Sequence, residues 1–88
     1  MQRTTNEAVV MSFDEFRIMV AESLGFKKNE LREDTSFLYD LGVDSLSLMN
    51  FILKLEKEYG IKFELSNIWE LKSLKKAYSI FLSAMEKL

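Results

Sequence analysis

Residues 36–46 read Ser-Phe-Leu-Tyr-Asp-Leu-Gly-Val-Asp-Ser-Leu, and this stretch joins a long polar connection to a long helix. The connection spans residues 25–43 and lacks helical periodicity, but we expect Phe37 and Leu41 to pin it to the core. After it, apolar residues recur at helical spacing as far as residue 59, where Gly60 can end a helix. We therefore predict a long loop followed by a helix that begins at residue 44 or 45.

The chain on either side of this stretch predicts further helices. Residues 12–24 have helical periodicity, and Ser12 and Glu15 have the spacing of a capping box. A brief helix is expected over residues 67–71, and a last helix over residues 72–87.

The composition favours a single all-α domain. The chain has 88 residues, of which 48% are hydrophobic and 30% charged, and it contains no proline. Such a length supplies one modest core. Residues 1–11 are polar and without periodicity, so we expect a flexible N-terminal tail followed by a domain over residues 12–88.

Several functional classes are disfavoured by the residues that are missing. The sequence contains neither cysteine nor histidine, which excludes Cys/His zinc sites and Ser–His or Cys–His nucleophiles, although an enzyme could still use carboxylates or lysines. Acidic residues gather in 30–44, without the ligand spacing of an EF-hand, so no metal site is expected. The basic end, 72–88, is too weakly charged for nucleic acid, and no apolar stretch is long enough for a membrane span. We expect a cytoplasmic monomer.

The stretch quoted above resembles the phosphopantetheine attachment sequence of acyl carrier proteins. The similarity consists of Phe37, then Asp-Leu-Gly over residues 40–42, then Asp-Ser-Leu over residues 44–46 at a helix start. In helix order and loop length it extends over residues 12–88. The resemblance implies a four-helix bundle with three longer helices, a short third helix and a long loop between helices one and two.

The resemblance also implies that Ser45 carries a 4'-phosphopantetheine arm, transferred from coenzyme A by a magnesium-dependent phosphopantetheinyl transferase. A phosphodiester at that position would meet the positive end of the helix dipole. Gly42 would allow a sharp turn near Ser45, and Asp44 and Leu46 complete the predicted cofactor-binding set. The simpler interpretation is that Ser45 only caps the helix.

The resemblance implies a carrier and not an enzyme. A carrier of this family holds acyl groups as thioesters and presents them to acyl-transferring, condensing or reducing enzymes of fatty-acid, specialised lipid or polyketide synthesis. The resemblance implies an acyl cleft between the long helix and the short third helix, lined here by Phe51, Ile52, Leu55, Ile68 and Leu71. It implies a surface for partner enzymes formed by Asp44, Leu46, Met49, Leu53 and Glu56.

Two features distinguish this chain from a strongly acidic carrier and keep alternatives open. Ser47, Asn50 and Lys57 stand where family members often have acids, which favours a specialised pathway with weaker electrostatic steering. The alternatives are a peptidyl or aminoacyl carrier of the same fold, a helical protein-interaction module without a prosthetic group and, more remotely, an enzyme of unrecognised type. Trp69 is expected to be partly buried packing.

Overall fold

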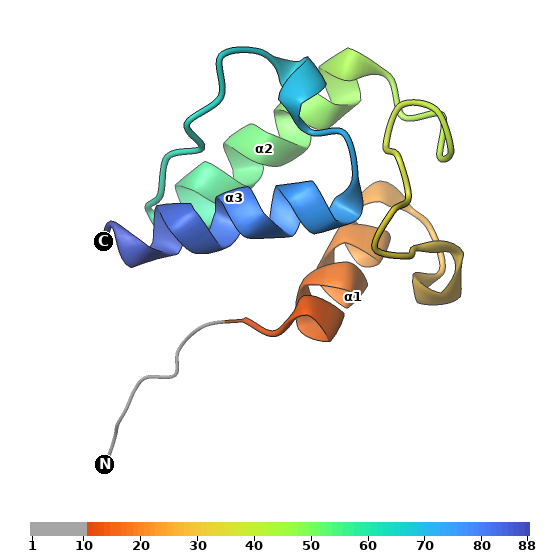
Figure 1. The fold of residues 1–88 in the computed structure, drawn as a ribbon, viewed down its shortest axis with the longest axis horizontal. Coiled ribbons are helices and arrows are strands. Elements are labelled where there is room, and N and C mark those ends of the chain that lie inside the picture. Colours follow the sequence, from red (N-terminus) through yellow and green to blue (C-terminus); the bar gives the residue numbers. More distant parts are fainter. Residues whose placement is uncertain (1–10) are drawn as a thin grey trace.

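The computed structural model describes residues 11–88, where helices and 3-10 turns are the only regular secondary structure (Figure 1). Its elements are, in order, α1 (Phe13–Leu24), the 3-10 turn η1 (Lys28–Glu30), α2 (Ser45–Tyr59), the 3-10 turn η2 (Ile68–Glu70) and α3 (Leu74–Glu86). The predicted all-α class is confirmed for this part of the chain. Its helices include none that is long and apolar enough to cross a membrane. The predicted tail lies outside the described residues except for its last residue, Met11.

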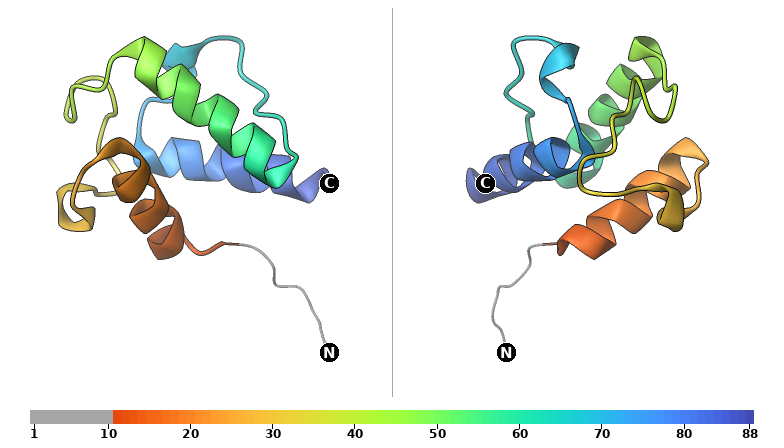
Figure 2. Two further views of the ribbon diagram at one scale, coloured as in Figure 1. Left: turned by 180° about the vertical axis from the view of Figure 1, so that it is seen from behind. Right: turned by 45° about the vertical axis from the view of Figure 1, so that its right-hand side comes forward.

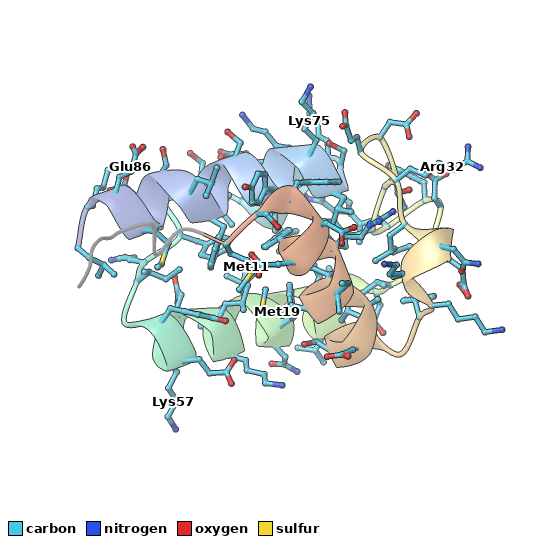
Figure 3. All side chains as sticks on the ribbon, turned by 90° about the horizontal axis from the view of Figure 1, so that it is seen from below. Met11, Met19, Arg32, Lys57, Lys75 and Glu86 are labelled. Atoms are coloured by element: carbon cyan, nitrogen blue, oxygen red, sulfur yellow. The ribbon has the colours of Figure 1, made fainter. Side chains whose placement is uncertain are left out.

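The three α-helices enclose one core. Figure 2 shows α2 crossing α3. Helix α1 contacts α3, and it also contacts α2, where the Tyr59 hydroxyl lies 3.6 Å from the Met19 sulfur. Aromatic side chains join the helices: the rings of Phe16 and Phe81 have centroids 5.3 Å apart, and Tyr59 meets Phe81 edge-on at 5.5 Å. Seen from below, Met11 and Met19 point inward between the helices, while Lys57 on α2 points away (Figure 3). The core is thus shared by all three helices.

The start of α1 follows the predicted capping box. The Ser12 hydroxyl accepts a hydrogen bond from the Glu15 amide at 3.1 Å, and the Glu15 carboxylate accepts one from the Ser12 amide at 2.9 Å. Met11, just before the cap, is half-buried, and its carbonyl accepts a hydrogen bond from the Tyr78 hydroxyl at 2.8 Å. The folded part of the chain therefore already includes Met11.

The long connection between α1 and α2 is held down at several points. Leu31 and Phe37 are buried in the core, as predicted for Phe37, whereas Leu41 is only half-buried. The backbone of this connection also pairs with the start of α3, because the Leu74 amide donates to the Thr35 carbonyl at 2.9 Å. This loop is therefore a fixed part of the domain surface.

The third helix is shorter than predicted. Where a helix over residues 67–71 was expected, the structure has the single 3-10 turn η2, capped by Asn67, whose side chain accepts from the Trp69 amide at 2.9 Å. The last helix begins at Leu74 with Ser73 as its cap, two residues later than predicted. Both caps are short polar side chains that compete with helical hydrogen bonding, which explains why the helix boundaries fall there.

Candidate functional site at the start of α2

Ser45 is the first residue of α2, and its side chain is exposed. The capping function belongs to its neighbour: the Asp44 carboxylate accepts a hydrogen bond from the Ser47 amide at 2.7 Å. Within residues 11–88 the Ser45 hydroxyl has no hydrogen-bond partner. The simpler interpretation of Ser45 as a helix cap is therefore wrong, and its hydroxyl is available for chemistry.

Asp44 is held in its ionised form. The hydrogen bond from the Ser47 amide is the main reason that the pKa of its carboxyl lies below the ordinary 3.8, and the Ser47 side chain and the Leu46 amide add to this effect. Hydrogen bonds to a carboxylate favour its charged form. A negative charge therefore stands beside Ser45 at neutral pH, at the helix end where the dipole also favours it.

Two backbone features fix the approach to Ser45. Gly42 has a φ of 68°, in the left-handed region where a side chain is strained, and a Cβ placed there would meet nothing within 4 Å. The next residue, Val43, is buried, and its amide donates to the Phe37 carbonyl at 2.9 Å. The turn is therefore anchored by Val43 and Phe37 and leaves open space around Gly42, just before Ser45.

These features fit a covalently attached phosphodiester. The hydroxyl is exposed, the backbone nearby leaves room for a substituent, and the first amides of α2 supply the positive end of a helix dipole. Leu46, next along the helix, is 71% exposed, so no apolar side chain buries the hydroxyl from this side. The same geometry suits an attachment point that a second protein must reach.

The helix that begins here has two apolar faces. One face forms part of the core and consists of Leu48, Phe51, Ile52 and Leu55. The other is exposed: Leu46 is 71%, Leu53 52% and Met49 38% accessible to solvent. We call these three residues the α2 stripe. The α2 stripe therefore faces solvent.

The residues predicted to line an acyl cleft do lie together, because η2 packs on α2. Phe51, Ile52, Leu55 and Leu71 are each at most 5% exposed, and Ile68 is half-buried. They form closed core packing in this conformation. A cargo could reach them only after η2 moves away from α2.

Two side chains lie differently from the sequence-based expectation. Glu56, predicted as a partner-contact acid, is half-buried, and its carboxylate accepts a hydrogen bond from the Phe63 amide at 2.8 Å. It thereby holds the segment after α2 in place. Trp69, predicted to be partly buried packing, is 58% exposed, because its three-residue turn is too short to bury both Ile68 and Trp69.

Comparison with known proteins agrees with this geometry. A family model described as "Phosphopantetheine attachment site" matches residues 14–79. The chain is 32% identical over 85 residues to "Polyketide-8 synthase acyl carrier protein 2" of Streptomyces avermitilis, covering 97% of this chain and 95% of that protein. It is 31% identical over 71 residues to an acyl carrier protein of Lactobacillus acidophilus, covering 81% and 89% of the two chains. With an acyl carrier protein of Clostridium acetobutylicum the identity is 36% over 52 residues, 59% of this chain and 68% of the other.

The family match extends over most of the chain and includes the loop, α2 and η2. The motif of residues 36–46, the exposed serine at a helix start and the relatives' names all point to the same conclusion. The family's cofactor is 4'-phosphopantetheine, and its members carry acyl groups for other enzymes and are not enzymes themselves. This chain belongs to the acyl carrier protein family.

Proposed function

We propose that Ser45 is the attachment point for the phosphopantetheine arm and that the protein carries acyl intermediates as thioesters between partner enzymes. The observation that best supports this proposal is that the residue capping α2 is different from the residue that presents the hydroxyl. Asp44 caps the helix, so the Ser45 hydroxyl remains exposed and without a partner within residues 11–88. A serine that only capped the helix would itself accept the hydrogen bond from an amide of the first turn.

The transfer requires a nucleophilic oxygen that an external enzyme can reach. The Ser45 oxygen forms a new bond to the phosphorus of coenzyme A that bears the pantetheine. The bond from that phosphorus to the oxygen shared with the nucleotide's phosphate breaks, so that adenosine bisphosphate leaves, and the hydroxyl proton passes to the transferase. Once attached, the arm supplies a terminal thiol that holds an acyl group as a thioester. Asp44, ionised beside the site, would contact the transferase or its magnesium ion.

The acyl-cleft proposal assigns a second role to the packing of η2 on α2. Phe51, Ile52 and Leu55 present an apolar wall, and Ile68 and Leu71 cover it from η2. Burying each methylene group contributes about 0.8 kcal/mol, so a medium-length acyl chain would gain several kcal/mol. Because η2 is a single three-residue turn, which acts here as a short third helix, it can move without unwinding a long helix.

Partner recognition is proposed to depend on the α2 stripe with Asp44 as the neighbouring acid. Glu56 contributes less than expected, since its carboxylate already accepts the Phe63 amide. With Lys57 exposed on the same helix, α2 has little negative charge to steer basic partners. We infer a monomeric cytoplasmic carrier for a specialised pathway, which the polyketide name of one relative supports.

Intact mass spectrometry tests the proposal. Incubation with coenzyme A and a broad-specificity phosphopantetheinyl transferase should add one phosphopantetheinyl group to wild type and none to Ser45→Ala. Ser47→Ala is the matched control: it removes another exposed hydroxyl from the first turn of α2, and it should still gain the group. An unmodified wild type, or a fully modified Ser45→Ala, would exclude Ser45 as the attachment point.

The pathway is tested by comparing donors and partners. Acyl donors should load the arm in preference to aminoacyl donors, which distinguishes this carrier from a peptidyl carrier. Binding to enzymes of housekeeping fatty-acid synthesis should be weak and only slightly dependent on salt. Tight, strongly salt-dependent binding would contradict the specialised assignment.

A further inference from the structure

A small basic hollow lies between α3 and the chain that follows α2. Its volume is about 190 Å³. One wall is a face of α3, and the other wall belongs to the residues just after Gly60. We call this cavity the α3 hollow, and its charged and hydroxyl side chains are Lys62, Glu64, Lys76, Ser79, Ser83 and Lys87.

The α3 hollow is separate from the attachment site. In Figures 1 and 2 the C-terminal half of α3 lies beside the end of α2, whereas Ser45 stands at the start of that helix. The 15 residues of α2 span about 22 Å. The hollow also shares no residue with the α2 stripe or with the predicted acyl cleft. The carrier function proposed above therefore leaves its side chains unused.

The spacing of residues along α3 builds the first wall. Lys76, Ser79, Ser83 and Lys87 follow one another at intervals of three, four and four residues, which places them on one face of the helix. Ser79 and Ser83 occupy the middle of this face, and a lysine stands toward each end. Two hydroxyl groups are thus flanked by two flexible ammonium groups.

The second wall is held in place by the end of α2. Burial alternates along it: Ile61 and Phe63 are buried, while Lys62 and Glu64 are exposed. The Phe63 amide donates a hydrogen bond to the Glu56 carboxylate at 2.8 Å. This anchor fixes the segment, so the side chains of Lys62 and Glu64 remain beside α3.

Positive charge dominates the α3 hollow. The Lys87 ammonium forms an ion pair with the Glu64 carboxylate. That hydrogen bond is the main reason that the pKa of Glu64 lies below the ordinary 4.5, and the nearby charge of Lys62 adds to the effect. Lys62 and Lys76 have no ion-pair partner within residues 11–88. Three lysines against one ionised glutamate leave two positive charges without compensation.

These groups suit a phosphate monoester. Such a group carries about −1.5 to −2 charges at neutral pH and three strong acceptor oxygens. Two uncompensated lysines match that charge, and no hydrogen bond within the described part of the chain engages the Ser79 or Ser83 hydroxyl, so both can donate to the oxygens. At about 30 Å³ per water molecule the hollow has room for roughly six waters, which accommodates one phosphate group.

We propose that the α3 hollow is a binding site for a phosphate monoester group, carried by a small soluble molecule or by a lipid headgroup. Lys62 and Lys76 would bind the phosphate oxygens as cations, and the Ser79 and Ser83 hydroxyls would donate to them. The rest of the molecule would extend into solvent, because the hollow holds little more than the phosphate. The site does not depend on the arm at Ser45.

NMR titration of the isotope-labelled full chain tests the site. Inorganic phosphate and glycerol 3-phosphate are added at neutral pH, with sodium chloride at matched ionic strength as the reference. Both phosphates should cause saturable shifts of the amides of Lys62, Glu64, Ser79 and Ser83, while the Ser45 amide stays in place. The Ser45→Ala protein should respond identically, which separates this site from the carrier site.

Matched pairs of variants distinguish the hollow from general surface charge. Lys76→Gln should weaken glycerol 3-phosphate binding by about tenfold, the loss expected for one charge-assisted hydrogen bond. Lys75→Gln removes the same charge from the neighbouring residue, outside the hollow, and should change the affinity by less than about twofold.

The acids supply the opposite test. Glu64→Gln removes the negative charge from the hollow and releases Lys87, so it should strengthen binding. Glu33→Gln removes an equal charge from the acid that pairs with Lys75, and it should have little effect.

A vesicle arm separates the two sources of the phosphate. Sedimentation with phosphatidylcholine vesicles that contain phosphatidic acid, but not with phosphatidylcholine alone, would assign the site to a lipid headgroup. Saturable binding of glycerol 3-phosphate without sedimentation would assign it to a soluble molecule. Shifts that never saturate, that sodium chloride reproduces, or that Lys75→Gln and Lys76→Gln weaken equally would overturn the site. Failure of Ser45 to accept the arm would refute the carrier proposal and leave this one standing.

Discussion

Replacing Phe37 with alanine should destabilise the domain strongly, because this side chain anchors the long loop in the core. Phe37 is 1% exposed. A phenylalanine buries about 150–200 Å² of largely apolar area, and at about 25 cal/mol per Å² this corresponds to about 4 kcal/mol. Phe→Ala substitutions in protein cores cost about 3–5 kcal/mol, which agrees with that figure.

The loss should be visible in urea unfolding followed by circular dichroism at 222 nm. A domain of this size has a free energy of unfolding of about 5–10 kcal/mol, so Phe37→Ala would remove roughly half of it. With a slope near 1 kcal/mol per molar urea, the midpoint should fall by roughly 4 M. Because the Phe37 carbonyl also accepts the Val43 amide, hydrogen exchange of Val43 should accelerate in the variant.

Tyr39→Ala is the matched control, since Tyr39 lies two residues further along the same loop but is 84% exposed. Its free energy of unfolding should remain within about 0.5 kcal/mol of wild type. If Phe37→Ala lost less than about 1 kcal/mol, or if Tyr39→Ala lost as much as Phe37→Ala, the loop would not be anchored through Phe37.

Four further results are expected. In NMR titrations the Asp44 carboxyl should have its midpoint at a pH below 3.8. The stability that this cap provides should be complete above pH 3.8 and should disappear as the pH falls through the lower pKa of the folded state. A midpoint at or above pH 3.8 would contradict the cap. Gly42→Ala should cost about 1–2 kcal/mol in chemical unfolding, because φ is 68° there while the surrounding space is open, and an unchanged stability would rule out backbone strain as the reason for this glycine. Ser12→Ala should lower the free energy of unfolding by about 1 kcal/mol through loss of the capping box, measured in the same way, and no loss would show that the box is not formed in solution. Leu53→Ser should leave the unfolding midpoint nearly unchanged yet weaken binding to an acyl-transferring partner in calorimetry, and undiminished binding would remove Leu53 from the partner surface.

The longer helices and their ends could be predicted from the sequence because their signals are local. The capping box of Ser12 and Glu15 is a spacing of three residues, and Gly25 and Gly60 end α1 and α2 in the left-handed conformation that glycine favours. The apolar periodicity that ends at residue 59 predicted the extent of α2 for the same reason. These features depend on residues within one or two turns of each other.

The features that sequence reasoning missed depend on contacts between distant segments. The sequence predicted Glu56 to be an exposed acid on the long helix. In the structure the chain after α2 folds back, and the Phe63 amide donates a hydrogen bond to the Glu56 carboxylate. Trp69 is exposed because η2, which Asn67 caps, forms only one turn. The pairing of Leu74 with the Thr35 carbonyl joins residues far apart in sequence, and no periodicity reveals it.

At the attachment site, the sequence predicted the right serine environment but left open which residue caps the helix. Both serine and aspartate are favoured caps, so composition alone does not decide between Asp44 and Ser45. The backbone decides: Asp44 has the extended conformation of a cap, with φ −76° and ψ 163°, whereas Ser45 is already helical. This one-residue difference leaves the Ser45 hydroxyl available.

Peptide mapping by tandem mass spectrometry tests the central claim most directly. After treatment with coenzyme A and the transferase, the protein is digested and the fragments that contain the start of α2 are sequenced. The phosphopantetheinyl group should be found on the Ser45 oxygen, with Ser36 and Ser47 unmodified. A group located on either of those serines, or on no serine at all, would contradict the assignment of this protein's carrier site.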